Sequence, residues 1–479
     1  MKIKTIIASE IAPLDSDVRT GGGTDATAAL QAALDEALSC GGVRLVMDGA
    51  ALVRSLHVHS NTTIECLTPD CGFFQKAQTN RAIVSNANWD RYSLKDRNIA
   101  LIGGTYNQDC RNQAHEVRWE DDAPHRLPTQ DLQNDRKWGS GDIQHMIDNR
   151  WVFGLEFYGV ENLLVRDVIV RDFRTFALTV GGFRNVLCEN VWLDLPNRMH
   201  AQNQDGFHFW GPGRFLTVRN VGGRVGDDFM NIGPDEIDGV SDISDVLVDG
   251  VLLDDADQGI RMLSTGTGRL DRVTVRNVSG TYRSFGFLLN PWFTKGTYGN
   301  FGNIFFENID LRQTAPNFDY RPPFLFCIGG NVECMTFKNI RHHHPCDSRT
   351  LFEIGVPFYV PGIALPDGSM PRMKTIIVDG LTVIEESDAA AGTEYIQVRG
   401  EVERLMVNNA TVLRAPGLDP AGTLLAVKDD GKIGTLHLSH VHVEGLEALV
   451  VNEERIARTL SHQVEFCSDV QEPRGGTVI

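Results

Sequence analysis

The chain has 479 residues and a formal charge of −18 at pH 7, with 63 acidic residues against 45 Lys and Arg residues. Nucleic-acid phosphates attract basic surfaces, so we expect no nucleic-acid partner. Hydrophobic residues make up 42% and charged residues 23% of the sequence, which excludes disorder and a coiled coil. A single compact core stops growing at roughly 250–300 residues, so the length predicts several domains or a stack of repeats.

The N-terminal part of the chain predicts one amphipathic helix. Apolar residues at 26, 29, 30, 33, 34, 37 and 38 follow the helical period after an N-cap candidate, and Gly41-Gly42 ends the pattern. Short β-branched runs follow it, and no comparable helix recurs. We expect residues 1–50 to form an N-terminal cap with this helix and residues 51–479 to form one elongated β domain.

A repeat runs through that domain. Short strands reach a turn position, mostly Asn, Asp or Gly, at intervals of mostly about 23–31 residues. The ten turn positions are 167, 190, 220, 250, 277, 308, 339, 380, 409 and 440. Leucine-rich repeats would show a regular Leu spacing, and helical repeats would show a helical period in every unit. The pattern therefore predicts an all-β fold, a right-handed parallel β-helix whose open end the N-terminal helix covers.

Three carboxylates recur at the coil interval. Asp205 in Asn203-Gln204-Asp205-Gly206 precedes the pair Asp227 and Asp228 by 22 and 23 residues. Strands of neighbouring coils lie about 4.8 Å apart, so the three side chains should share one surface. Carboxylates that close shift one another's pKa and supply an acid beside ionised bases, as inverting glycoside hydrolysis requires. The alternative is that each Asp only forms a turn, since Asp-Gly is a common turn pair, but the stacked set favours catalysis.

Candidate substrate-binding residues surround this set. Arg261 follows Asp228 by 33 residues and would bind carboxylates or hydroxyls through its planar fork, or would be a solvated strand-edge charge. Tyr282 and Trp292 are candidates for stacking on sugar rings, with core packing as the alternative. His208 is a candidate binding residue or a structural histidine.

In these residues the sequence resembles the polygalacturonase-like glycoside hydrolases, family 28, of the pectate-lyase-like β-helix superfamily. The matching segments are Gly23 to Ala33, Gly103-Gly104-Thr105-Tyr106, Asn203-Gln204-Asp205, Gly226-Asp227-Asp228 and Gly259-Ile260-Arg261. The resemblance implies that Asp227 is the general acid, that Asp205 and Asp228 position and activate the water, and that Arg261 holds the substrate beside the scissile bond. Asn203 belongs to the same motif and is a candidate binding residue.

Two departures from the family concern its acidic substrate. The family's Gly-His-Gly coil has no counterpart, since Asp249-Gly250-Val251 stands there and no His occurs from 209 to 341. The family Lys two positions after the Arg is Leu263. A neutral or differently charged glycan is therefore as good a candidate as galacturonan. The expected activity is a glycosidase on oligo- or polysaccharide, inverting and, by hypothesis, exo-acting.

Other activities fit the same fold. A β-helix polysaccharide lyase would use bound Ca²⁺, for which Asp254, Asp255 and Asp257 are candidate ligands, and fructotransferases also occur on β-helices. A non-catalytic carbohydrate-binding solenoid is a further alternative. The run His342-His343-His344 suggests a metal site, but consecutive strand residues point to opposite faces and a surface loop is the favoured interpretation. We expect no metal and no cofactor.

The sequence also bears on location. Apolar runs are shorter than the ~18–20 residues of a membrane span, and the start of the chain is too short in apolar residues for a signal peptide. The nine cysteines are scattered without a close pair, which predicts reduced thiols. We expect a cytoplasmic protein with no membrane partner and a carbohydrate substrate. The pattern leaves the choice between a monomer and a homotrimer open.

Overall fold

The computed structural model of the chain describes most of its residues. The described ranges are 3–113, 152–197, 204–289, 297–314, 324–344, 350–355, 371–385, 393–415, 417–428 and 430–468. The chain divides into two compact units, residues 1–256 and 257–479.

The first unit is built from parallel strands. They are β1 (Lys4–Ile7), β2 (Val43–Met47), β3 (Ala50–Val53), β4 (Leu56–Val58), β5 (Thr62–Cys66), β6 (Gly72–Gln75), β7 (Val84–Asn86), β8 (Asp96–Ile102), β9 (Thr105–Asn107), β10 (Leu155–Arg166), β11 (Ile169–Arg171), β12 (Leu178–Glu189), β13 (Trp192–Asp194), β14 (Phe207–Gly223), β15 (Asp228–Gly233) and β16 (Ile243–Met262), whose last six residues belong to the second unit. Three 3₁₀ turns occur among the described residues, at Ala8–Glu10, Cys110–Asn112 and, in the second unit, Glu453–Arg455.

In the first unit each strand pairs with the equivalent strand of the next coil. β2 pairs with β5, β5 with β8, β8 with β10, β10 with β12, β12 with β14 and β14 with β16, all in parallel. A second series of parallel pairs runs β3, β6, β9, β11 and β13. Parallel pairs at a fixed sequence interval are the signature of a β-helix, in which each coil stacks on the one before it. The predicted all-β, right-handed parallel β-helix is confirmed.

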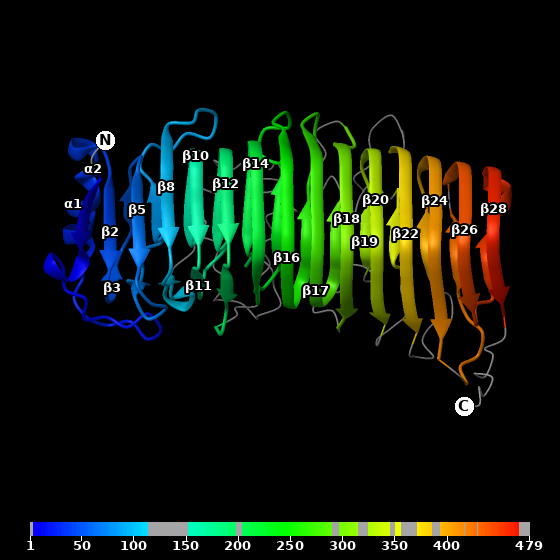
Figure 1. The fold of residues 1–479 in the computed structure, drawn as a ribbon, viewed down its shortest axis with the longest axis horizontal. Helices are drawn as coiled ribbons and strands as arrows, with labels where there is room; N and C mark the ends of the chain where they lie inside the picture. Colours follow the sequence, from blue (N-terminus) through cyan, green and yellow to red (C-terminus); the bar gives the residue numbers. More distant parts are fainter. Residues whose placement is uncertain are drawn as a thin grey trace, which may run out of the picture. The chain divides into compact units, whose positions relative to one another are not determined.

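The second unit repeats the same plan. Its strands are β17 (Arg269–Leu289), β18 (Asn300–Gln313), β19 (Phe324–Ile328), β20 (Asn331–His344), β21 (Phe352–Ile354), β22 (Arg372–Glu385), β23 (Glu394–Val398), β24 (Glu401–Arg414), β25 (Thr423–Val427), β26 (Lys432–Glu444), β27 (Ala448–Val451) and β28 (Ile456–Cys467). β18 pairs with β20, β20 with β22, β22 with β24, β24 with β26 and β26 with β28, again in parallel. Figure 1 shows these long strands side by side in sequence order within the unit.

The predicted N-terminal helix is present as two short segments, α1 (Thr27–Asp35) and α2 (Ala37–Cys40). α2 ends at Gly41, whose φ of 92° is the left-handed conformation that the Gly-Gly stop predicts. α1 buries Leu30 and Leu34 and packs against β2 and β4 (Figure 1). β1 pairs with β2 within the first 50 residues, so strand pairing begins inside the predicted cap, and the boundary at residue 50 stays a prediction.

The predicted turn positions have the backbone conformation that the sequence implies. All ten, from Asp167 to His440, have positive φ angles between 51° and 84°. Asn and Gly tolerate this left-handed region better than other residues. Their side chains also bond from coil to coil: Asn190 Nδ2 donates to Asp167 Oδ1 over 2.8 Å, and Asn339 Nδ2 donates to Asn308 Oδ1 over 3.1 Å. These ladders fix the register of successive coils.

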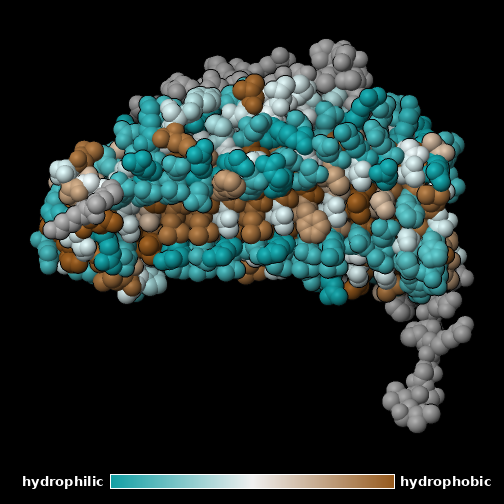
Figure 2. Space-filling view, turned by 45° about the horizontal axis from the view of Figure 1, so that its top comes forward, coloured by the Kyte–Doolittle hydropathy of each residue, from teal (hydrophilic) through white to brown (hydrophobic). Residues whose placement is uncertain are grey.

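Stacked side chains fill the interior and also line one outer strip. In the second unit Phe287 and Phe326 stack with centroids 4.6 Å apart, and Phe306 stacks on Phe337 at 5.1 Å. On the outside, Figure 2 shows an apolar strip bordered by hydrophilic rows. In the first unit the outward positions Leu164 and Leu187 are paired in register and are half-buried. Like residues therefore stack on both faces of the strands.

Three other expectations bear on the fold. Among the described residues, no helix has both the length and the apolar character that crossing a membrane would take. Of the cysteines in the described part of the chain, Cys66, Cys71, Cys110, Cys188 and Cys327 are buried and the others are half-buried, while their reduced state stays a prediction. The expectation that His342 and His343 lie on a surface loop is wrong: both belong to strand β20, and His342 is fully buried.

Candidate active site

Asp205 and Asp228 hold equivalent positions on neighbouring coils of the first unit. Phe207 of β14 pairs with Met230 of β15, and Asp205 and Asp228 each lie two positions before these register partners. The backbone agrees, because Gly206 N donates to Asp228 O over 2.9 Å. The two residues are 2% and 0% exposed. The structure therefore places both buried aspartates on adjoining coils that a backbone hydrogen bond joins at this point.

Asp227 is hydrogen-bonded to Gln204, the residue before Asp205. The carbonyl of Gln204 accepts hydrogen bonds from Gly226 N over 2.8 Å and from Asp227 N over 3.3 Å. Gln204 is itself fixed, because its Nε2 donates to Phe173 O over 2.9 Å. Asp227 is 5% exposed. All three predicted carboxylates therefore come from two adjoining turns tied together by backbone hydrogen bonds.

Gly206 explains the Asp-Gly sequence at this turn. A Cβ atom on Gly206 would lie 2.3 Å from Phe229 O and 2.5 Å from Leu193 Cδ1. Real Cβ atoms do not approach backbone that closely, so the coils can stack here only without a side chain. The glycine lets Asp205 approach the coil that carries Asp228.

His208 is in contact with Asp205. Its Nδ1 lies 3.2 Å from Asp205 Oδ2, and its Nε2 lies 3.4 Å from Glu236 Oε2. The His208 side chain is 4% exposed, so the ring bridges two carboxylates away from bulk water. Burial lowers the pKa of His208, but contacts with Asp205 and Glu236 outweigh burial and raise the pKa to about 9. The imidazolium is therefore the form present at neutral pH.

Further residues complete the contacts of this ring. Glu236 Oε2 accepts hydrogen bonds from Trp210 Nε1 over 2.8 Å and from Asn231 Nδ2 over 2.9 Å. The amide of Asn231 also contacts His208 Nε2. Phe176 stacks on His208 with centroids 4.1 Å apart, and the Trp210 ring lies 4.6 Å away. Aromatic rings and hydrogen bonds together hold the imidazole in one orientation.

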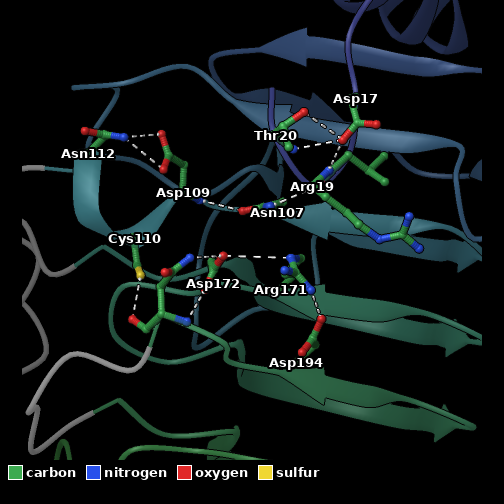
Figure 3. Close-up of polar contacts among 12 residues, drawn as sticks. Asp17, Arg19, Thr20, Asn107, Asp109, Cys110, Asn112, Arg171, Asp172 and Asp194 are labelled. Atoms are coloured by element: carbon green, nitrogen blue, oxygen red, sulfur yellow. Dashed lines mark hydrogen bonds and ion pairs between the residues drawn. The ribbon is translucent and has the colours of Figure 1, made fainter. Parts of the chain in front are cut away.

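A second polar network anchors the chain before Asp205. Asp172 accepts hydrogen bonds from Asn197 N over 3.0 Å and from Asn197 Nδ2 over 2.9 Å. Arg171 Nε lies 3.8 Å from Asp172 Oδ2, and the Arg171 guanidinium forms an ion pair with Asp194 (Figure 3). Cys110 Sγ donates to Asn197 O over 3.4 Å. Asn197 stands eight residues before Asp205, so this network fixes one end of the segment that leads into the site.

The interior side of the site is supported by Gln108. Its Oε1 accepts from Arg174 N over 2.7 Å, and its Nε2 donates to Phe153 O over 2.6 Å. Phe153 stacks on Phe176, with centroids 5.0 Å apart, on the coils next to Asp205. Arg174 and Gln108 are both fully buried. This bonding holds the backbone of Arg174 and the ring of Phe153 in place.

Of the remaining predicted site residues, two belong to the second unit and two fall outside the described residues. Arg261 is a half-buried residue of β16 in the second unit. Tyr282 is also in the second unit and is 1% exposed, with its hydroxyl 2.8 Å from His342 Nε2. This buried position suits core packing, the alternative to stacking on a sugar. Asn203 and Trp292 lie outside the described residues.

The residues proposed for calcium do not form a ligand set. Asp254 pairs with Arg224 over 3.1 Å, and Asp257 accepts from Ser284 Oγ over 2.9 Å. In the described ranges there is no group of three or more His, Cys, Asp or Glu side chains arranged to hold a metal ion. The site instead offers carboxylates and one imidazole, which are groups for moving protons.

Sequence reasoning missed Asn231 and Glu236. Asn231 was detectable, because it follows His208 by 23 residues, the same interval that links Asp205 to Asp228. His208 and Asn231 are register partners on β14 and β15. Glu236 follows the end of β15 and is not a register partner of His208, so only the fold reveals its contact with His208.

Comparison with known proteins gives no family assignment. No family model matches this sequence, and no curated protein matches it. Among solved structures, the chain is similar to a family 28 exopolygalacturonase from Yersinia enterocolitica at 14% identity and a TM-score of 0.48, covering 98% of this chain and 79% of that one. It is also similar to a hyperthermoactive exopolygalacturonase from Thermotoga maritima, at 13% identity and a TM-score of 0.45, covering 97% and 93% of the two chains.

A third solved structure has a different activity. It is a mannuronan C-5 epimerase module from Azotobacter vinelandii, at 11% identity and a TM-score of 0.45, covering 95% of this chain and 99% of that one. One fold can host many unrelated activities, so function has to be argued from the residues of the site.

Proposed function

We propose that the protein is a glycoside hydrolase that cleaves oligo- or polysaccharide with the carboxylates of Asp205, Asp227 and Asp228. The observation that carries the proposal is the placement of Asp205 beside the coil of Asp227 and Asp228, through backbone hydrogen bonds from Gly206 to Asp228 and from Asp227 to Gln204. Three carboxyl groups on adjoining turns of a solenoid match the chemistry of glycosidic bond hydrolysis, which uses one acid and one base.

The roles follow from the motif resemblance and from hydrolytic chemistry. Asp227 donates a proton to the glycosidic oxygen as the bond between that oxygen and the anomeric carbon breaks. A water held by Asp205 and Asp228 attacks the anomeric carbon from the opposite face and gives its proton to one of these carboxylates. The products are a new reducing end and a free hydroxyl on the leaving sugar, and the anomeric configuration is inverted.

The surroundings of the carboxylates support this division of labour. Asp205 is in contact with an imidazolium, which favours its ionised form and therefore a role as base. The backbone of Asp227 is held by the carbonyl of Gln204, which fixes the position of the proposed acid beside Asp205. Buried carboxylates in a rigid, hydrogen-bonded setting cost little reorganisation during reaction.

The substrate class is a glycan whose charge the sequence leaves open. Arg261 is the proposed binding group for a sugar carboxylate or hydroxyl, as the motif resemblance implies. Exo-cleavage of short oligosaccharides is the proposed mode. Appearance of mid-chain fragments from a polymer in the first minutes of reaction would contradict it.

The proposal is tested by incubating the wild type and the Asp227→Asn variant with a panel of uronic-acid, neutral and fructan oligosaccharides. Mass spectrometry of the products should show addition of one water per bond cleaved by the wild type. The Asp227→Asn variant should lose this activity while binding the same oligosaccharide. An unsaturated product that absorbs in the ultraviolet, or activity that is indifferent to Asp227, would contradict the proposal.

The Asp167→Asn variant is a matched control for this experiment. Asp167 is an exposed turn residue with a φ of 60°, and Asn occupies the equivalent position on several neighbouring coils. In the wild type Asn190 Nδ2 donates to Asp167 Oδ1, and the Asn side chain of the variant keeps an Oδ1 atom that can accept this hydrogen bond. The control should keep wild-type activity, which would show that loss of one carboxylate elsewhere on the coil has no effect.

A further inference from the structure

Glu236 is positioned by three groups at one oxygen atom. Its Oε2 accepts from Trp210 Nε1 over 2.8 Å and from Asn231 Nδ2 over 2.9 Å, and it lies 3.4 Å from His208 Nε2. The Glu236 side chain is 9% exposed. A carboxylate oxygen held by two neutral donors is fixed in place, and its charge is directed at the imidazole.

His208 links Glu236 to Asp205, the proposed base. Its opposite ring nitrogen, Nδ1, lies 3.2 Å from Asp205 Oδ2. Each ring nitrogen therefore has a carboxylate oxygen near it, and the two negative charges favour the protonated ring over the neutral ring. An imidazolium carries an N–H on each side and a positive charge that attracts both carboxylates.

The charge of His208 depends on these two carboxylates. Among the described residues, the charged groups in contact with His208 are Asp205 and Glu236, while Phe176, Trp210 and Asn231 are neutral. The register partner on the other side, Thr179, is also neutral. Burial alone would expel the proton from the ring, so the proton is retained because of the two anions.

We infer that Glu236 is a positioning residue: it keeps His208 in the imidazolium form, and the imidazolium keeps the Asp205 carboxylate ionised and oriented to accept a proton from the attacking water. The inference rests on the proposed function, in which Asp205 acts as a base. Glu236 makes no contact with the reacting atoms in this scheme and acts only through His208.

The test replaces Glu236 by Gln, which keeps an oxygen acceptor for Trp210 and removes the charge. The titration of His208 is followed by NMR with labelled histidine, and the His208→Asn variant identifies its resonance. The proton dissociation constant of His208 should rise more than about tenfold in Glu236→Gln. In activity assays, the alkaline limb of the kcat profile should move to lower pH with KM unchanged within about twofold.

Asp238→Asn is the matched control, because Asp238 is a carboxylate on the same segment that accepts hydrogen bonds from Ser241 and Val240. The Asp238→Asn variant should have the same His208 titration midpoint as the wild type. A purely structural Glu236 would lower the stability of the variant and leave the midpoint and the pH profile in place. That result would overturn the inference.

The wild type alone supplies a second test if Glu236→Gln does not fold. His208 should titrate near pH 9 in the folded wild type, and a midpoint at or below its ordinary value of 6.5 would overturn the inference. The two hypotheses fail in different ways. Hydrolysis with an unchanged midpoint in the variant rejects the inference alone, while a lowered midpoint with no hydrolysis of any glycan rejects the proposed function.

Discussion

Asp205 and Asp228 lie on adjoining coils, each two residues before the paired residues Phe207 and Met230, and Gly206 N donates to the Asp228 carbonyl over 2.9 Å. The β-helix makes such a pair from residues 23 positions apart in sequence, because each coil returns the chain to the same face. The catalytic proposal and several measurable consequences follow from this geometry.

The first prediction concerns the proposed general acid. Asp227→Asn should lower kcat by roughly 10²–10⁴-fold, because the amide cannot donate the proton that the leaving oxygen needs. KM should change little, since the side chain keeps its size. Steady-state kinetics on the oligosaccharide that the wild type cleaves gives both constants. A reduction of less than about tenfold would show that Asp227 is not the acid.

The second prediction concerns pH and stability. The pKa of His208 is raised from 6.5 to about 9 in the folded protein, so the folded state holds this proton more tightly than the unfolded chain. The resulting stabilisation is present in full below the unfolded pKa and is lost as the pH rises through about 9, an effect of roughly 3 kcal/mol. Urea unfolding at about pH 6 and about pH 10 measures it. In His208→Asn this part of the pH dependence should vanish, and an unchanged slope would contradict the assignment.

The third prediction concerns the turn between the carboxylates. Gly206→Ala places a Cβ atom 2.3 Å from Phe229 O, so the two coils must separate locally. We expect a loss of about 1–3 kcal/mol in the free energy of unfolding and a large loss of activity, because Asp205 moves away from Asp228. Urea unfolding and kinetics together test this. Wild-type stability in the variant would mean that the coils are not packed at this distance.

The fourth prediction separates backbone conformation from side-chain bonding in the turn ladder. Asn308 has a φ of 55° and bonds to both Asn277 and Asn339. Asn308→Ala loses the bonds and strains the left-handed backbone, whereas Asn308→Gly loses only the bonds. The Ala variant should be less stable than the Gly variant by about 1 kcal/mol in urea unfolding. Equal stability of the two variants would show that the backbone conformation carries no strain.

The fifth prediction concerns Tyr282, a sequence candidate for sugar binding. Its ring is buried and its hydroxyl lies 2.8 Å from His342 Nε2. Tyr282→Phe should therefore lower the free energy of unfolding by about 1 kcal/mol and leave KM unchanged, as urea unfolding and steady-state kinetics can measure. A raised KM with unchanged stability would return Tyr282 to the substrate-binding surface.

Much of the fold could be predicted because the β-helix has a local signal. Asn, Asp and Gly mark most of the left-handed turns, and the positive φ angles of all ten predicted positions follow from their tolerance of that conformation. The helix at Thr27–Asp35 and the end of the helical segment at Gly41 follow from periodicity and from the same property of glycine. These features depend on residues close in sequence.

The site was only partly predictable because its contacts are not all periodic. The interval of one coil gives Asp205, Asp227, Asp228 and, in retrospect, Asn231. Glu236 contacts His208 from the segment after β15, outside the strand ladder that pairs His208 with Asn231. The burial of Tyr282 was not predictable either, because an aromatic residue suits a sugar-binding surface and a core equally well. Tertiary structure decides which of the two it occupies, and here the side chain is buried.

The measurement that tests the central claim most directly is the fate of solvent oxygen in a single turnover. Wild-type protein and its oligosaccharide substrate are mixed in water enriched in heavy oxygen, and the products are analysed by mass spectrometry and NMR. We predict one labelled oxygen at the anomeric carbon of the new reducing end, with inverted configuration, and no such product from Asp227→Asn. An unlabelled, unsaturated product, or label that enters equally in Asp227→Asn, would contradict the hydrolytic role of the three carboxylates.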